Sequence, residues 1–92
     1  MAGKEEDRSG LTVYPNPAEG LLTYKVKTGG ERLFHLSLFD EQGRLLHREE
    51  VDTQGAYEYQ GTLNLQKYTV PRLYLQMQGR SFYQTQKIIV LP

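Results

Sequence analysis

The residue types that most often catalyse reactions or bind metals are scarce in this 92-residue chain. It has no cysteine, which excludes a thiolate metal site, a cysteine nucleophile and a disulfide. Its only histidines, His35 and His47, fall on neighbouring expected strands at unequal distances from the turn between them. A metal site would need further ligands, such as Glu49 or Asp52, in tight geometry. We therefore interpret the histidines as exposed strand residues, and expect no metal and no other cofactor.

A catalytic triad could be written from Ser37, His35 and Asp40. A working triad also needs a sharp turn that exposes the nucleophile and a loop that supplies oxyanion donors. The sequence shows neither feature, and it shows no paired acid and base in a pocket-forming context. We expect no catalytic residues, and we expect that the chain is not an enzyme.

Tyrosine is frequent, with seven tyrosines and three phenylalanines. Aromatic rings beside basic residues can form a platform for sugars or single-stranded nucleic acid. The 11 basic and 11 acidic residues give a net charge of zero, which argues against a nucleic-acid partner and against an anionic membrane. Cross-strand packing accounts better for most of these rings. A carbohydrate-binding or adhesion module of a surface protein stays open as an alternative function.

The length is that of one domain, and the 38% of hydrophobic residues is compatible with a globular core. Residues 1–10 are polar and charged, and we interpret them as a linker or as residues of non-native origin, leaving 11–92 as the domain. No apolar run has the length of a signal segment or a membrane span. If the protein is exported, we expect its targeting signal on a longer precursor.

Apolar residues alternate with a period of two between turn signals, a pattern that predicts strands and no helix. The expected strands span residues 11–14, 21–27, 32–39, 44–51, 56–65, 73–78 and 81–91. The last has apolar residues on both sides, which predicts a central strand or one covered on both faces. About seven short strands predict an all-β fold, an antiparallel immunoglobulin-like β-sandwich without the Cys–Trp–Cys core of antibody domains.

Three blocks of sequence follow one another in a defined order. The first is Tyr14-Pro15-Asn16-Pro17, the second contains Asp40, Gly43 and Arg44, and the third is Lys87-Ile88-Ile89-Val90 near the end of the chain. In this order the blocks resemble the C-terminal sorting domain of the type IX secretion system, the Por secretion tail, over residues 11–92. Arg72 stands where such tails usually carry a glycine before a tyrosine-containing strand.

The resemblance implies a non-catalytic signal domain that directs an upstream, covalently attached cargo across the outer membrane and to the cell surface. The implied partners are the outer-membrane type IX translocon and a sortase-like processing protein that cuts the tail and couples the cargo to lipopolysaccharide. The implied location is secreted or on the cell surface, reached through the periplasm.

The physical character of the blocks suggests different roles for their residues. Pro15 and Pro17 restrict the backbone and Asn16 can cap a turn, so residues 14–17 and Asp40 are expected to form rigid structural corners. Gly43 and Arg44 are expected in an exposed turn. We interpret it primarily as a hairpin connection, with docking to a partner as the functional alternative. Residues 87–90 can serve the core, or be recognised by strand addition or end capture. Open edge strands also make a dimer possible.

Overall fold

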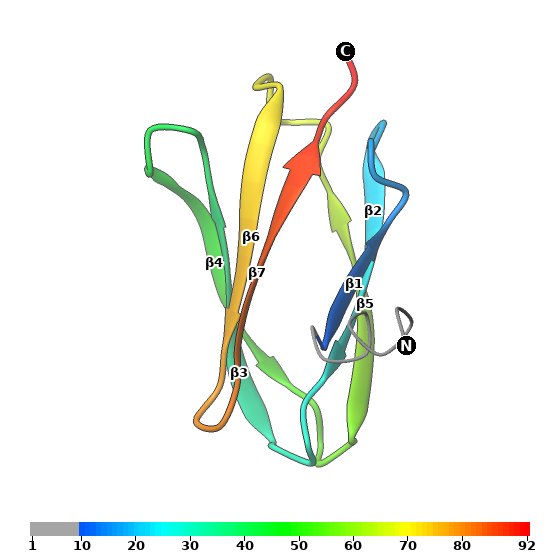
Figure 1. Ribbon diagram of the computed structural model, residues 1–92, viewed down its shortest axis with the longest axis vertical. Coiled ribbons are helices and arrows are strands. Elements are labelled where there is room, and N and C mark those ends of the chain that lie inside the picture. The colour runs from blue at the N-terminus through cyan, green and yellow to red at the C-terminus, as the bar shows by residue number, and fades with distance from the viewer. Residues whose placement is uncertain (1–9) are drawn as a thin grey trace, which may run out of the picture.

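A computed structural model describes residues 10–92 as two antiparallel sheets packed face to face (Figure 1). Residues 1–9, which make up most of the predicted linker, lie outside the described part. The seven strands are β1 (Leu11–Tyr14), β2 (Leu21–Lys27), β3 (Leu33–Phe39), β4 (Leu45–Asp52), β5 (Glu58–Asn64), β6 (Arg72–Gln78) and β7 (Tyr83–Ile89). The predicted all-β sandwich is confirmed. Over residues 10–92 there is no helix that could cross a membrane.

The two sheets are unequal in width. The smaller has the strand order β1-β2-β5 and the larger the order β4-β3-β6-β7. In a constant-type immunoglobulin domain the fourth strand lies beside the fifth. Here β4 pairs with β3 instead, so within residues 10–92 the outer edge of β5 has no neighbouring strand.

The core follows from the two-residue alternation along each strand, because successive side chains point to opposite faces. Fully buried residues lie on the inner faces of both sheets; they include Leu22, Val26, Phe34, Leu36, Leu73, Leu75, Met77 and Ile88. Each such side chain contributes about 1.5–3 kcal/mol through removal from water. Phe34 of the larger sheet meets Tyr59 of the smaller edge to face, with ring centroids 6.0 Å apart. This contact places β5 over β3.

The predicted central position of the last strand is wrong. β7 lies at an edge of the larger sheet, with β6 as its only neighbouring strand in the part of the chain that the structure describes. Its apolar end is instead covered by the chain that follows β1: Ala18 forms a parallel bridge with Val90. Ile88 is fully buried, whereas Ile89 and Val90 are half-buried. Ile88 thus belongs to the core and Val90 packs against it, while the backbone of Ile89 and Leu91 bonds to this crossing segment.

Candidate functional site

The sequence blocks lie far apart in the chain but meet at one end of the sandwich. We call this end the end face, and define it as the corner 14–18, the turn 40–44, the loop 65–71 and the segment 87–92. Strand register places them together, because Phe39 pairs with Tyr74 and Arg72 pairs with Ile89. In Figure 1 the C-terminus, the corner after β1 and the turn before β4 lie at the same end.

The side chain of Asn16 joins the first block to the third. Its amide nitrogen donates to the Lys87 carbonyl at 3.0 Å. Its oxygen accepts a hydrogen bond from the Ile89 backbone N–H at 2.9 Å. The sequence suggests that Asn16 caps its own turn. Its side chain instead pairs with the edge of β7, as a strand backbone would.

Ala18 continues this pairing one step further along the edge. Its N–H donates to the Ile89 carbonyl and its own carbonyl accepts from the Leu91 N–H, both at 2.8 Å. Ala18 is completely buried. Sequence reasoning assigned no role to Ala18, and the small size that lets it fit under the last strand was the only available signal.

Asp40 organises the turn between β3 and β4. One carboxylate oxygen accepts from the backbone N–H groups of Gln42 and Arg44, each at 2.9 Å, and the other accepts from the Arg44 guanidinium at 2.7 Å. The Arg44 backbone N–H above all, with the guanidinium and the Gln42 N–H, lowers the pKa of Asp40, although burial acts in the opposite direction. Gly43 has a positive φ of 83°, a conformation that glycine adopts readily. The predicted turn is therefore present and is held by a buried carboxylate.

Arg72 links this turn to the last strand. Its guanidinium donates to the Glu41 carboxylate at 2.7 Å, and its backbone lies in β6 opposite Ile89. Just before it, the Pro71 carbonyl accepts from the Val90 N–H at 2.9 Å. Arg72 does not have a positive φ, so the turn does not require the glycine found in similar tails. The sequence marked this position only as a departure from the family pattern.

A half-open hollow of about 540 Å³ lies beside the chain end. Its apolar lining comes from Leu65, Val70, Val90 and Leu91. Leu91 is 41% exposed, so part of this lining is accessible to a partner. The end face thus combines a hydrogen-bonded frame with an accessible apolar surface.

The residues proposed for recognition differ in accessibility. Lys87 and Gly43 are exposed, and the Arg44 side chain is 74% exposed despite its bond to Asp40. Ile88 is completely buried and cannot be contacted while the domain is folded. Ile89 and Val90 are half-buried, and Ile89 offers its backbone to Asn16 rather than to solvent.

The histidines lie on opposite faces of the larger sheet. His35 faces outward, 3.7 Å from Glu50, and His47 faces inward, 3.6 Å from Glu49. Within residues 10–92, no three His, Cys, Asp or Glu side chains cluster as metal ligands would. Both oxygens of Asp40 are bound within its own turn, so it does not orient His35 as a triad would require.

The most exposed tyrosines do not form one platform. Tyr14 and Tyr83 belong to different sheets, and Tyr57 precedes the start of β5, which pairs with the end of β2 away from the end face. Tyr24 is buried in the core. This distribution does not favour the carbohydrate-binding alternative, which predicts a row of exposed aromatic rings on one face.

Comparison with known proteins gives one clear result. The family model described as the secretion system C-terminal sorting domain matches residues 12–91. No curated protein matches the chain. The family match covers β2 to β7 completely, β1 except Leu11, and the end face except Pro92.

Proposed function

Because this chain belongs to the family of secretion system C-terminal sorting domains and is a sorting signal for type IX secretion, we propose that its end face is the surface read by the outer-membrane translocon. The family role is that of a signal, which is non-catalytic. Docking to the translocon is followed by processing by a sortase-like protein and attachment of the upstream cargo at the cell surface.

The observation that supports this choice of surface is the set of hydrogen bonds from Asn16 to Lys87 and Ile89. They hold segments more than seventy positions apart in one arrangement. A machine that exports unrelated cargoes must read a feature of the tail alone. A surface built from distant segments exists only after folding, so it would report that the tail is intact.

The chemistry of the end face suits a mixed polar and apolar contact. Lys87 and Arg44 present cationic groups to solvent, and Leu91 lines an apolar hollow. Central apolar contacts supply most of the energy of a protein interface, while charges at its rim mainly fix orientation and association rate. A translocon surface with carboxylates around an apolar projection would complement this arrangement.

Deleting residues 87–92 would not test the proposal cleanly, since it removes the buried Ile88 and part of β7. Surface substitutions are sharper. The tail is fused behind a reporter with a signal peptide, in a host with the type IX machinery, and Lys87→Glu and Leu91→Asp are compared with Lys27→Glu. Lys27 is also an exposed strand lysine, but it lies at the far end of β2.

We expect the parent tail and the Lys27→Glu tail to bring the reporter to the cell surface, and the two end-face variants to leave it in the periplasm. Purified domains should all show the same cooperative thermal unfolding. If folded Lys87→Glu and Leu91→Asp tails are exported like the parent, the translocon reads another surface. If even the parent tail fails to export the reporter, the sorting function of this chain is itself refuted.

A further inference from the structure

The free edge of β5 offers a row of backbone hydrogen-bonding groups. The Thr28 N–H donates to the Tyr57 carbonyl and the Leu65 N–H donates to the Gly20 carbonyl. In an antiparallel pair, alternate residues bond to the neighbouring strand and those between them point away from it. The residues of β5 whose backbone N–H and C=O groups point away from β2 are Glu58, Gln60, Thr62 and Asn64.

Within residues 10–92, the other long edges of the sandwich carry protecting features that the β5 edge lacks. The edge of β7 is covered at its end by Asn16 and Ala18. The edge strand β4 carries the charged residues Arg48, Glu49, Glu50 and Asp52. Charges and covering segments are the usual means by which proteins keep edges from pairing. β5 has no proline and only one charged residue, Glu58 at its start, so it is suited to accept another strand.

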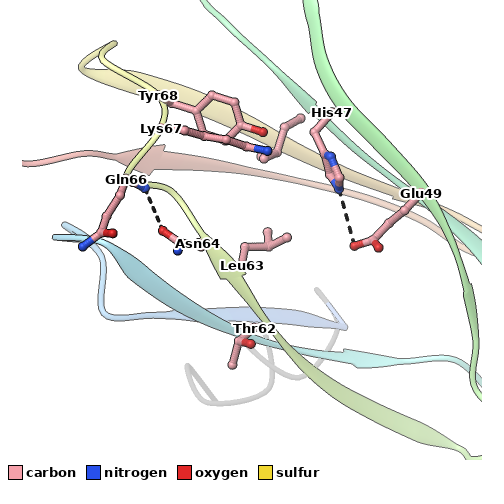
Figure 2. A pocket seen from close by; sticks show the side chains of 9 residues that line it. His47, Glu49, Thr62, Leu63, Asn64, Gln66, Lys67 and Tyr68 are labelled. Atoms are coloured by element: carbon pink, nitrogen blue, oxygen red, sulfur yellow. Dashed lines mark hydrogen bonds and ion pairs between the residues drawn. The ribbon is translucent and has the colours of Figure 1, made fainter.

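A groove of about 560 Å³ runs beside this edge. Figure 2 shows His47 and Glu49 on the β4 side, Thr62 and Leu63 on the β5 side, and the Lys67–Tyr68 loop at one end. The Lys67 ammonium lies 5.5 Å from the centre of the Tyr68 ring. The walls thus come from the two edge strands on the same open side of the sandwich.

The groove has the position of a missing strand. Because β5 lies over β3, β4 extends one strand beyond the smaller sheet. A strand added to β5 would lie over the inner face of β4. Immunoglobulin variable domains have a strand at the position beside the fifth strand and another at the position that β4 occupies here, beside the third strand. The architecture therefore accommodates a strand here.

A second folded copy cannot pair its β5 antiparallel to this one. A two-fold axis perpendicular to the sheet would place the copy's β3 where β4 already lies, because β3 lies beneath β5 in each copy. The overhanging β4 excludes a sheet but not a single chain. This excludes an antiparallel β5–β5 dimer.

We propose that the β5 edge and the groove above β4 bind one extended peptide strand of a protein partner, with a basic side chain facing inward towards Glu49. The Glu49 side chain faces the groove by register and is 44% exposed. Its neighbour His47 compensates its charge only when the imidazole is protonated. Backbone pairing with β5 supplies the affinity, and the inward side chains supply the selection. This site does not rest on the role of the end face.

The test uses the whole chain and a capped seven-residue peptide, TVTKTVT, titrated by amide NMR. The peptide alternates so that valine and lysine face inward while threonine faces outward. We expect saturable shifts concentrated in residues 58–64 and 47–51. Glu49→Gln should weaken binding about threefold. The matched control Glu50→Gln should not, because Glu50 points to the other face of β4 beside His35.

Two methylated peptides test the backbone pairing without altering the protein. We place the peptide antiparallel to β5. The amide groups of the outward threonines are then the ones directed at β5, so N-methylation of the central two should abolish binding. N-methylation of the valines should leave it unchanged. Thr62→Pro should weaken binding of the parent peptide about tenfold, because it removes a backbone N–H directed at the peptide. The domain should still fold, since proline is tolerated at an edge whose N–H faces solvent.

Each contrary result would overturn the proposal. These are the absence of saturable shifts at millimolar peptide, shifts centred on β7, and equal binding of the two methylated peptides. A dimer in analytical ultracentrifugation that is abolished by Thr62→Pro would also overturn it, because a second copy would then be the occupant.

Discussion

Asn16 and Ile89 are 73 positions apart in the chain, and the backbone N–H of Ile89 donates to the side-chain oxygen of Asn16 at 2.9 Å. The same side chain returns a hydrogen bond to the Lys87 carbonyl at 3.0 Å. The side-chain amide of asparagine places a donor nitrogen and an acceptor oxygen in the spacing of a peptide group. The Pro-Asn-Pro corner therefore uses a side chain to close the edge of the last strand.

The first prediction concerns this pair of bonds. Asn16→Ala should lower the free energy of unfolding by about 1–2 kcal/mol, since two hydrogen bonds are lost. Asn16→Asp should cost a similar amount, because a carboxylate cannot donate to Lys87 and places charge beside its carbonyl. Urea denaturation measures both effects, and hydrogen exchange should show the Ile89 amide losing protection.

Asn64→Ala is the matched control for Asn16. The Asn64 side chain accepts only the local hydrogen bond from the Gln66 N–H, at 3.0 Å, among the residues that the structure describes. Its loss should leave exchange at Ile89 unchanged. Equal protection of Ile89 in the Asn16→Ala and Asn64→Ala variants would contradict the role assigned to Asn16.

The second prediction concerns Gly61, whose place in β5 depends on Tyr24. The two residues are directly paired, and a β-carbon at Gly61 would lie 2.5 Å from the Tyr24 hydroxyl oxygen and 2.6 Å from the ring carbon that bears it. Gly61→Ala should therefore destabilise the domain by about 1–3 kcal/mol through overpacking. Thermal or urea unfolding of the purified domain measures it.

A double-mutant cycle separates this clash from a general loss of strand propensity. Tyr24→Leu removes the ring, so Gly61→Ala should cost less in that background than in the parent. In a Tyr83→Leu background, where the altered residue lies on the other sheet, the cost should equal that in the parent. Additive energies for Gly61 and Tyr24 would show that the ring is not the obstacle.

The number of strands and the inward residues could be predicted from sequence, because alternation reports directly which face of a strand is buried. The burial of Phe34, Leu36 and Leu38 in the core follows from this rule. The edge position of β7 could not be predicted. Alternation does not distinguish a neighbouring strand from a crossing segment such as the one at Ala18, and both bury apolar side chains.

The candidate site was predicted in its parts but not in its assembly. The blocks at residues 14–17, 40–44 and 87–90 stand out by composition and order. The bonds that join them are made by Asn16 to two backbone groups and by Arg72 to Glu41. Backbone groups carry no sequence signal, and an ion pair 31 positions apart leaves none in a single sequence. The groove beside β5 depends on the pairing of β4 with β3, which local patterns do not determine.

The third prediction is that Arg72 contributes little to stability. Arg72→Gly should preserve the fold and lower the free energy of unfolding by less than about 1.5 kcal/mol, combining the exposed ion pair with the entropic cost of glycine. The side chains of Arg72 and Glu41 are 46% and 38% exposed. Glu41→Gln should cost less than Arg72→Gly, since it removes the ion pair alone. A loss of several kcal/mol in urea denaturation would mean that Arg72 orders the turn.

The fourth prediction concerns acid stability and begins with three carboxylates that accept backbone hydrogen bonds. Glu31 accepts from the N–H groups of Arg80 and Ser81 and ties the β6–β7 turn to the start of β3. Asp40 and Asp52 accept from N–H groups in the turns that follow them. In each case the first cause of the lowered pKa is a backbone hydrogen bond: from Arg80 to Glu31, from Arg44 to Asp40 and from Gln54 to Asp52.

A carboxyl group whose pKa is lower in the folded state binds protons more tightly when the chain unfolds. Its contribution is therefore complete above the ordinary values, 4.5 for Glu31 and 3.8 for Asp40 and Asp52, and is lost progressively as the pH falls below them. The urea midpoint should be level from pH 7 to pH 5.5 and fall steeply below pH 4.5.

Asp40→Asn should lower the midpoint at pH 7 and reduce that slope, because one linked group is removed. Glu19→Gln, which alters an exposed loop carboxylate, should leave the slope unchanged, and equal slopes for Asp40→Asn and the parent would show that the turn carboxylate does not control acid unfolding.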